Sequence, residues 1–159
     1  MKSDTLFILI LKLNQQTYGI TVNHIMQIID MVTITPLPLT HSAIRGVINF
    51  RGEIVPVIDL RLRLNFAFKP YQLHTPIILT HFDGRKLGVV VDDVEDIIEI
   101  FQESIEEDPL ITTLNIAKKE KTPPLFGLAK IDKEIIPILH LEELLTKRDL
   151  TQLEQVLGK

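Results

Sequence analysis

Residues 44–60 read IRGVINFRGEIVPVIDL. Two apolar runs flank Arg51-Gly52-Glu53, where Gly52 can supply the positive φ that a tight hairpin turn requires. Pro56 interrupts the second run, and a proline inside a strand is typical of an edge position or a bulge. The stretch therefore predicts a strand, a tight turn and a returning strand.

The same pattern returns 81 residues later, in residues 125–141 (LFGLAKIDKEIIPILHL). At this offset Gly46 aligns with Gly127, and Pro56 aligns with Pro137. Glycine and proline fix backbone geometry, so their recurrence at matching positions indicates a repeated structural unit.

A second hairpin pattern is repeated at an offset of 69. Residues 6–13 and 18–22 are apolar runs around a polar tetrapeptide, and the stretch aligns without a gap with residues 76–98. Gly19 falls on Gly88, and Ile25 falls on Val94.

Two blocks that recur in the same order predict two copies of one β-unit, packed as two small barrels that share apolar surface. The fold class is therefore all-β with short helices. The single domain spans residues 1–159, with a first barrel at 15–75, a second at 76–146 and a C-terminal helix at 147–159. Whether the N-terminal strand is shared between the barrels stays open.

Other segments carry weaker signals. Residues 23–30 predict a short helical turn that runs into a strand, and the charged residues 99–124 predict a loop. Thr151-Gln152-Leu153-Glu154 has the form of a capping box, which predicts two short helices with a break at 146–149.

Composition limits the functional classes. The chain is 45% hydrophobic and 24% charged, as for an ordinary folded domain, and it has no cysteine. The absence of cysteine excludes disulfides, thiolate metal sites and cysteine nucleophiles, and it fits a reducing cytoplasm. The apolar run at residues 6–11 is too short to insert into a membrane.

The net charge is unevenly distributed along the chain. Residues 1–80 hold seven Lys/Arg and four Asp/Glu, giving +3, whereas residues 81–159 hold ten and 17, giving −7. An acidic chain without a basic stripe is a poor ligand for nucleic acid. Two halves of opposite net charge suit head-to-tail docking of related modules. A surface whose charges are simply solvated and unevenly distributed explains the difference equally well.

The sequence lacks recognisable catalytic motifs. None of the seven glycines forms a phosphate-binding loop, and none of the five histidines falls in a metal-ligand spacing. Asp92, Asp93, Glu95 and Asp96 form the densest acidic cluster, which could hold a cation or act as an acid–base pair. Their counterparts in the other copy include Asn23 and His24, which favours a structural role at a strand end.

Arg51 differs from its surroundings. It lies at the predicted hairpin tip beside Phe50, and its counterpart in the second copy is Asp132. Arginine beside an apolar residue at a tight turn is typical of an interface anchor, although most turn arginines are simply solvated.

These motifs together resemble the CheW family of chemotaxis coupling proteins. The most specific part is the string G-V-x-N-x-R-G-x-I-V-P-V-x-D-L-R, from Gly46 to Arg61. Tyr18-Gly19-Ile20, Pro36-x-Pro38 and residues 87–92 and 126–141 also match, so the resemblance covers residues 5–146. It implies two five-stranded SH3-like barrels with a terminal helix, and no catalysis, metal or cofactor.

The resemblance also implies partners: the regulatory domain of the histidine kinase CheA and the cytoplasmic tips of methyl-accepting chemoreceptors. It implies that Gly46 and the adjoining barrel surface support kinase docking. The residues that it implies on or near the partner contacts are Arg51, Ile25, Val94 and Ile97. Gln27 stands where many relatives have glutamate.

Two alternatives remain open from the residues. One is a small enzyme or metal-binding protein that uses Asp92, Asp93, Glu95 and a histidine. The other is a generic SH3-like scaffold for a pilus-motility or other signalling complex. For the protein itself we expect no nucleic-acid partner and no direct membrane insertion.

Overall fold

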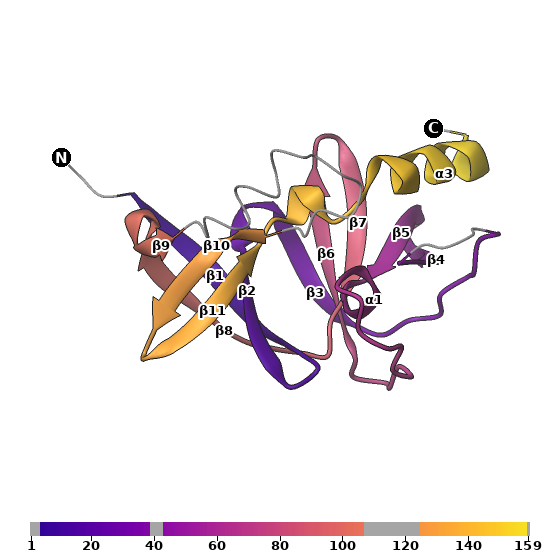
Figure 1. Ribbon diagram of the computed structural model, residues 1–159. Helices are drawn as coiled ribbons and strands as arrows, with labels where there is room; N and C mark the ends of the chain where they lie inside the picture. Colours follow the sequence, from indigo (N-terminus) through magenta and orange to yellow (C-terminus); the bar gives the residue numbers. More distant parts are fainter. Residues whose placement is uncertain (1–3, 39–42, 107–124, 159) are drawn as a thin grey trace.

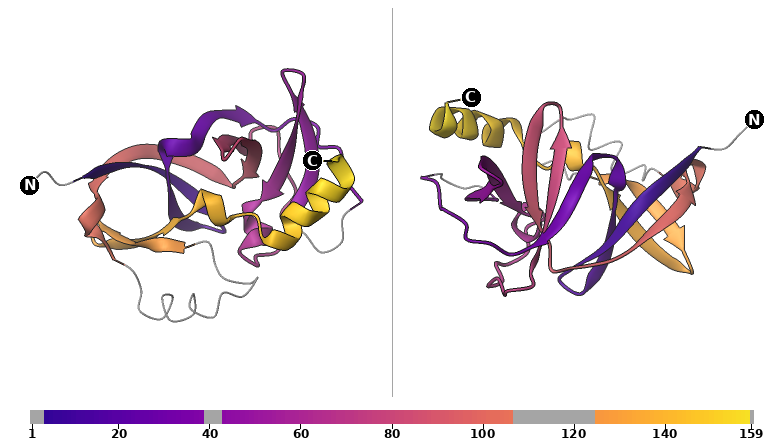
Figure 2. Two further views of the ribbon diagram at one scale, coloured as in Figure 1. Left: turned by 90° about the horizontal axis from the view of Figure 1, so that it is seen from above. Right: turned by 180° about the vertical axis from the view of Figure 1, so that it is seen from behind.

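The computed structural model describes residues 4–38, 43–106 and 125–158, which form two strongly curved β-sheets side by side (Figure 1). The C-terminal helix lies beside one of the sheets, far from the other (Figures 1 and 2). No helix within these residues is both long enough and apolar enough to cross a membrane.

The first sheet, barrel A, combines strands from both ends of the chain. Its strand order is β8-β1-β2-β11-β10-β9. The bounds are β1 Thr5–Leu13, β2 Gln16–Thr21, β8 Asp93–Phe101, β9 Ile105–Glu106, β10 Leu125–Ile131 and β11 Glu134–Leu139. The short β9 follows β8 after the 3₁₀ turn η2, Gln102–Ser104, and pairs with β10 at the opposite end of the strand order.

The second sheet, barrel B, has the strand order β3-β6-β7-β5-β4. The bounds are β3 Ile25–Asp30, β4 Ile44–Phe50, β5 Glu53–Asp59, β6 Pro76–Phe82 and β7 Arg85–Val90. The remaining helices are η1 Val22–His24, α1 Leu60–Arg63, η3 Leu141–Glu143 and α3 Lys147–Leu157. The predicted all-β class with two SH3-like barrels and a C-terminal helix is confirmed.

The two repeats exchange their first hairpins. Barrel A joins hairpin β1–β2 of the first copy to β8, β10 and β11 of the second, and barrel B joins hairpin β6–β7 of the second copy to strands of the first. The register is equivalent: Ile138 opposes Gly19 in one parallel pair, and Val57 opposes Gly88 in the other. The predicted barrel boundaries 15–75 and 76–146 are therefore wrong, because each barrel takes strands from both segments.

Exchange of the hairpins buries β1 on both faces from Ile8 to Leu11. Ile8 and Ile10 point into barrel A, whereas Leu9, Leu11 and Leu13 belong to a core between the barrels. This explains the uninterrupted apolar run near the N-terminus, since a strand covered on both sides has no polar face. Each fully buried aliphatic side chain contributes roughly 1.5–3 kcal/mol by leaving water.

The sequence predicted an edge position or a bulge at Pro56, and the edge is wrong, because β5 is an interior strand. The β4–β5 pair does contain a register shift, between Ile44 and Gly46 on β4. Strand β5 pairs with β7 only at Val57–Asp59, so the position of Pro56, without an N–H donor, lies beyond that pairing. Pro137 stands in the same relation to β2, which pairs with β11 only at Ile138 and Leu139.

Two further sequence predictions need correction. Residues 99–106 are not loop, since they hold the end of β8, η2 and β9; the rest of that predicted loop lies outside the described residues. The capping box begins at Thr146, not at Thr151. Thr146 Oγ1 accepts a hydrogen bond from Asp149 N and Asp149 Oδ2 accepts one from Thr146 N, each at 3.0 Å.

Candidate protein-interaction surface

The β4–β5 turn presents Arg51 at the tip of barrel B. Arg51 and Gly52 both have positive φ, 51° and 85°, as expected for a two-residue hairpin turn that follows the twist of its strands. Asn49 Oδ1 accepts a hydrogen bond from Gly52 N at 2.9 Å, which fixes the turn. The Arg51 guanidinium lies 4.9 Å from the centre of the Phe50 ring, so its exposed cation is held over an aromatic face.

The equivalent turn of barrel A has a different surface. Asp132 and Lys133 have positive φ there, and Asp132 takes the place of Arg51. Ile54 and Ile135, which correspond at the 81-residue offset, are both exposed by 66%. Each hairpin therefore carries one exposed isoleucine, beside a cationic turn in barrel B and a turn of mixed charge in barrel A.

Gly46 is buried and makes a close backbone contact. A Cβ built on it would lie 2.1 Å from Thr35 O, and its φ of +146° is one that side chains rarely adopt. The close approach comes from two hydrogen bonds, Thr35 N to Val47 O at 2.8 Å and Val47 N to Thr35 O at 2.9 Å. Gly46 thus shapes the surface around β4 and has no side chain to offer a partner.

The other predicted residues lie on strands β3 and β8, which correspond at the 69-residue offset. Ile25 and Val94 are half-buried and pack against the core between the barrels, whereas Gln27 and Ile97 are exposed. In the strand order of barrel B, two strands separate β3 from β5 and three separate β3 from β4, so Arg51 and the β3 residues lie on strands that are not neighbours. The predicted residues therefore form two groups: the β4–β5 turn and the β3 and β8 strands.

Several exposed apolar residues escaped sequence reasoning: Phe7, Met26, Ile28, Val32, Ile54, Phe101 and Ile135. All but Val32 lie in strands, where an apolar side chain is normally assigned to the core. The repeat held a usable signal, since Ile28 corresponds to Ile97 and Val32 corresponds to Phe101.

The acidic residue Asp92 has a structural role. Its Oδ2 lies 2.6 Å from Arg61 Nη1 and accepts a hydrogen bond from Asn14 N at 2.7 Å. The two charged side chains are only 9% and 15% exposed. This ion pair joins α1 to the β1–β2 turn of barrel A and so ties the barrels together.

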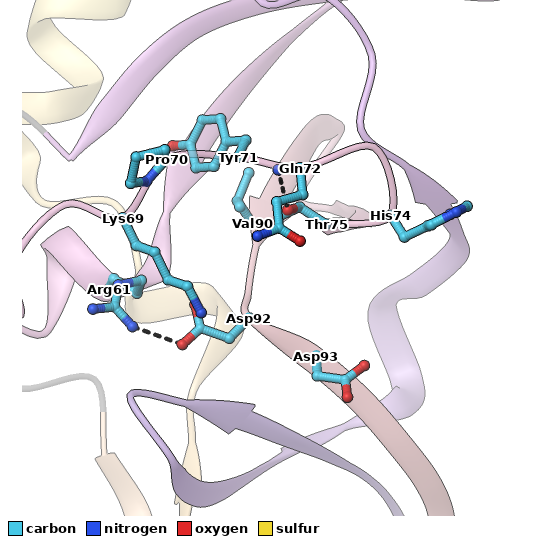
Figure 3. A pocket seen from close by; sticks show the side chains of 10 residues that line it. All are labelled: Arg61, Lys69, Pro70, Tyr71, Gln72, His74, Thr75, Val90, Asp92 and Asp93. Carbon is cyan, nitrogen blue, oxygen red and sulfur yellow. Dashed lines mark hydrogen bonds and ion pairs between the residues drawn. The ribbon is translucent and has the colours of Figure 1, made fainter.

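A neighbouring pocket of about 230 Å³ lies beside this ion pair. Figure 3 shows Arg61 and Asp92 pointing toward each other, while His74 points away. On the loop above, Tyr71 donates a hydrogen bond to Asp59 Oδ2 at 2.6 Å. Burial and this hydrogen bond raise the pKa of Tyr71 above its usual value, so the phenol stays protonated.

The metal-site alternative finds no support in the geometry. Across residues 4–38, 43–106 and 125–158, no group of three or more His, Asp or Glu side chains is arranged to hold a metal ion. Asp92 pairs with Arg61, and Asp93 Oδ1 accepts a hydrogen bond from Val94 N. Glu142 lies between His24 and His140, at 3.5 and 3.8 Å from their ring nitrogens.

Comparison with known proteins tests the family resemblance over nearly the whole chain. The profile of the CheW-like domain matches residues 8–149. The chemotaxis protein CheW of Klebsiella aerogenes is 30% identical over 148 residues, which cover 93% of this chain and 86% of that relative. The chain belongs to the CheW-like domain family.

Other relatives of this CheW-like chain agree. The chemotaxis protein CheW of Thermotoga maritima is 27% identical over 140 residues, covering 87% of this chain and 86% of that one. The crystal structure of the scaffolding protein TtCheW from Thermoanaerobacter tengcongensis superposes with a TM-score of 0.78 and 32% identity, covering 92% of this chain and 96% of that chain. The resemblance inferred from the motifs is confirmed, and the CheW-like chain is a chemotaxis coupling adaptor.

Proposed function

We propose that this adaptor works in the cytoplasm, has no catalytic activity of its own, and binds two partners at once. The partners are the regulatory domain of the histidine kinase CheA and the cytoplasmic tips of methyl-accepting chemoreceptors. Family membership supports a place in a chemotaxis complex, and the surfaces of the two barrels support the choice of two unlike partners.

The observation that carries this proposal is the difference between two barrels of equivalent topology. The described barrel A residues, 4–24, 91–106 and 125–139, hold three Lys/Arg and ten Asp/Glu, giving −7. The described barrel B residues, 25–38 and 43–90, hold seven and four, giving +3. A duplicated scaffold with opposite surface charge suits a protein that binds two different partners.

The receptor surface in this proposal is the rim of the core between the barrels. Ile25 and Ile28 on β3, and Val94 and Ile97 on β8, are half-buried or exposed apolar residues at equivalent positions. Exposed isoleucine beside a buried core suits the apolar face of an amphipathic helix, which is how many helices dock on a partner. Gln27 on β3 adds a neutral hydrogen-bonding group.

The kinase surface in this proposal is the end of barrel B around Arg51 and Ile54. Arginine is enriched at interface hot spots, and an exposed isoleucine beside it supplies apolar contact. Gly46 supports this surface by holding β4 against Thr35. Because the resemblance implies a kinase regulatory domain of the same double-barrel fold, contact between barrel ends can be repeated head to tail.

The chain provides a matched pair of variants to test the kinase surface. Ile54→Ser and Ile135→Ser change the same residue at equivalent positions with the same exposure. In titration calorimetry with the CheA regulatory domain, we expect Ile54→Ser to weaken binding about tenfold or more, whereas Ile135→Ser retains the affinity. Co-sedimentation with a receptor signalling fragment and CheA should yield a ternary complex, and failure of the unmodified chain to bind either partner contradicts the proposal.

A further inference from the structure

The antiparallel pair of β1 and β8 exposes large apolar side chains on its outer face. In this antiparallel pair Leu9 opposes Ile97, Phe7 opposes Glu99 and Thr5 opposes Phe101, so these side chains point to the same side. Phe7, Ile97 and Phe101 are 49%, 59% and 56% exposed. We call Phe7, Ile97, Glu99 and Phe101 the β8 face.

The β8 face continues the core between the barrels. Leu9 is buried in that core, and Val94, two pairs along on the same side, packs against it. Beyond Leu9 the row emerges into solvent at Ile97 and Phe7. A ligand that covers Ile97, at the rim of the core between the barrels, therefore contacts Phe7 and Phe101 next.

Barrel B carries an equivalent face on β3 and the segment after it. Ile28 corresponds to Ile97 and Val32 to Phe101, and both are also exposed. The apolar positions are thus retained in the two copies. The flanking positions differ, because Met26 and Gln27 in one copy are replaced by Glu95 and Asp96 in the other.

The charge around the β8 face is strongly negative. Glu95, Asp96, Glu99 and Glu103 are all exposed, and the sequence contains no Lys or Arg from residue 87 to residue 117. Over the described ranges, none of these four carboxylates takes part in an ion pair or a side-chain hydrogen bond. On the β3 side the corresponding acid is Asp30, which lies 3.3 Å from His74 Nδ1.

We infer that the β8 face binds an amphipathic segment whose apolar side chains are flanked by lysine or arginine, and that the four carboxylates on and around this face, those of Glu95, Asp96, Glu99 and Glu103, fix the direction in which that segment lies. The inference rests on the proposed receptor binding and names its chemistry. The apolar anchors on β3 and β8 are alike and accept either direction. Only one side is acidic, so a helix with a one-sided basic stripe has a single favourable orientation.

The repeat supplies the variant that tests this. Glu95→Met with Asp96→Gln transplants the residues that stand at the equivalent positions of β3, so the strand geometry is preserved. The matched control, Asp132→Asn with Glu134→Gln, removes the same charge from barrel A at the β10–β11 turn. Asparagine tolerates the positive φ of Asp132.

Binding is measured by titration of a soluble chemoreceptor signalling fragment at about 50 and about 300 mM NaCl, conditions that change the screening of exposed charges. For the Glu95→Met/Asp96→Gln variant we expect affinity about three- to tenfold lower at low salt and a weaker salt dependence. For the control pair we expect neither change. Circular dichroism and denaturation midpoints verify that both variants are folded.

The outcomes separate this inference from the proposed function. If the unmodified chain fails to bind the fragment, the adaptor proposal fails with it. If it binds, but the transplant and the control behave alike, the acidic orientation is wrong and receptor binding stands. If sedimentation shows self-association of the chain that only the transplant abolishes, the occupant is a second copy and the inference is overturned.

Discussion

The ion pair between Arg61 and Asp92 is the side-chain contact on which the junction of the barrels most depends. Both side chains are largely buried, and removal of one leaves the other charged and without its partner. We expect Arg61→Leu to lower the free energy of unfolding by about 3–5 kcal/mol. Urea denaturation measures this, with Lys86→Ala as the control. Lys86 pairs with the exposed Glu53, so Lys86→Ala should lower the free energy of unfolding by no more than about 1 kcal/mol. A larger loss in Lys86→Ala would contradict the view that burial makes the Arg61–Asp92 pair the more important one.

Gly46 is limited by space as well as by backbone conformation. The Thr35 carbonyl occupies the position of its Cβ, and that contact is to backbone, which cannot rotate away. We expect Gly46→Ala to cost about 1–3 kcal/mol of stability and to disturb the Thr35–Val47 bridge. Gly84→Asn is the comparison, since Gly84 also has positive φ but open space around it. Equal stability of the two variants would show that the close approach does not matter.

This changes how Gly46 can be tested as a docking residue. A Gly46 variant would lose binding through altered packing, so its binding defect could not be separated from destabilisation. Ile54, which is exposed and next to Arg51, gives the direct test of the same surface.

At the scale of elements, the start of α3 depends on the capping box of Thr146 and Asp149. We expect Thr146→Ala to lower stability by about 1 kcal/mol, because the side chain satisfies a free N–H at the helix start. Thr151→Ala should change stability by less than about 0.5 kcal/mol, since Thr151 Oγ1 bonds only to Lys147 O within the helix. Thermal denaturation compares the stabilities of the two variants. A larger loss of stability in Thr151→Ala than in Thr146→Ala would support the capping box predicted from the sequence at Thr151.

The individual strands could be predicted because their signals are local. Alternating or continuous apolar runs around turn residues place β1, β2, β4, β5, β6 and β7 within a few residues of their observed bounds. The exchange of hairpins could not be predicted. A repeat shows which segments are alike, but not which copy each one pairs with, and the three-residue turn η1 is enough to carry the chain from β2 into the other sheet.

The candidate surface was only partly predictable for a related reason. Arg51 and Asp132 stand out at turns, where side chains are exposed by position. Phe7 and Phe101 lie on strands whose neighbours are buried, and only the three-dimensional packing shows that barrel B covers Leu9 and leaves Phe7 open.

At the scale of the whole molecule, the shared core predicts that the barrels unfold together. The chain contains two tyrosines and no tryptophan. Tyr18 lies in β2 of barrel A, and Tyr71 packs against the interior of barrel B. The fluorescence of Tyr71→Phe therefore reports the core between the barrels, against which Tyr18 packs, and that of Tyr18→Phe reports the interior of barrel B. For each variant we expect one denaturation transition that coincides with its circular dichroism. Separate midpoints would mean that the barrels are independent domains.

In our proposal, two equivalent barrels with different surfaces connect a kinase to its receptors. The most direct measurement is the rate of CheA autophosphorylation in the presence of receptor-containing membranes as this protein is titrated in. We expect receptors to stimulate the kinase only when the protein is present, and we expect Ile54→Ser to reduce the stimulation while Ile135→Ser does not. Kinase activity that responds equally to receptors with and without the protein would contradict the proposal.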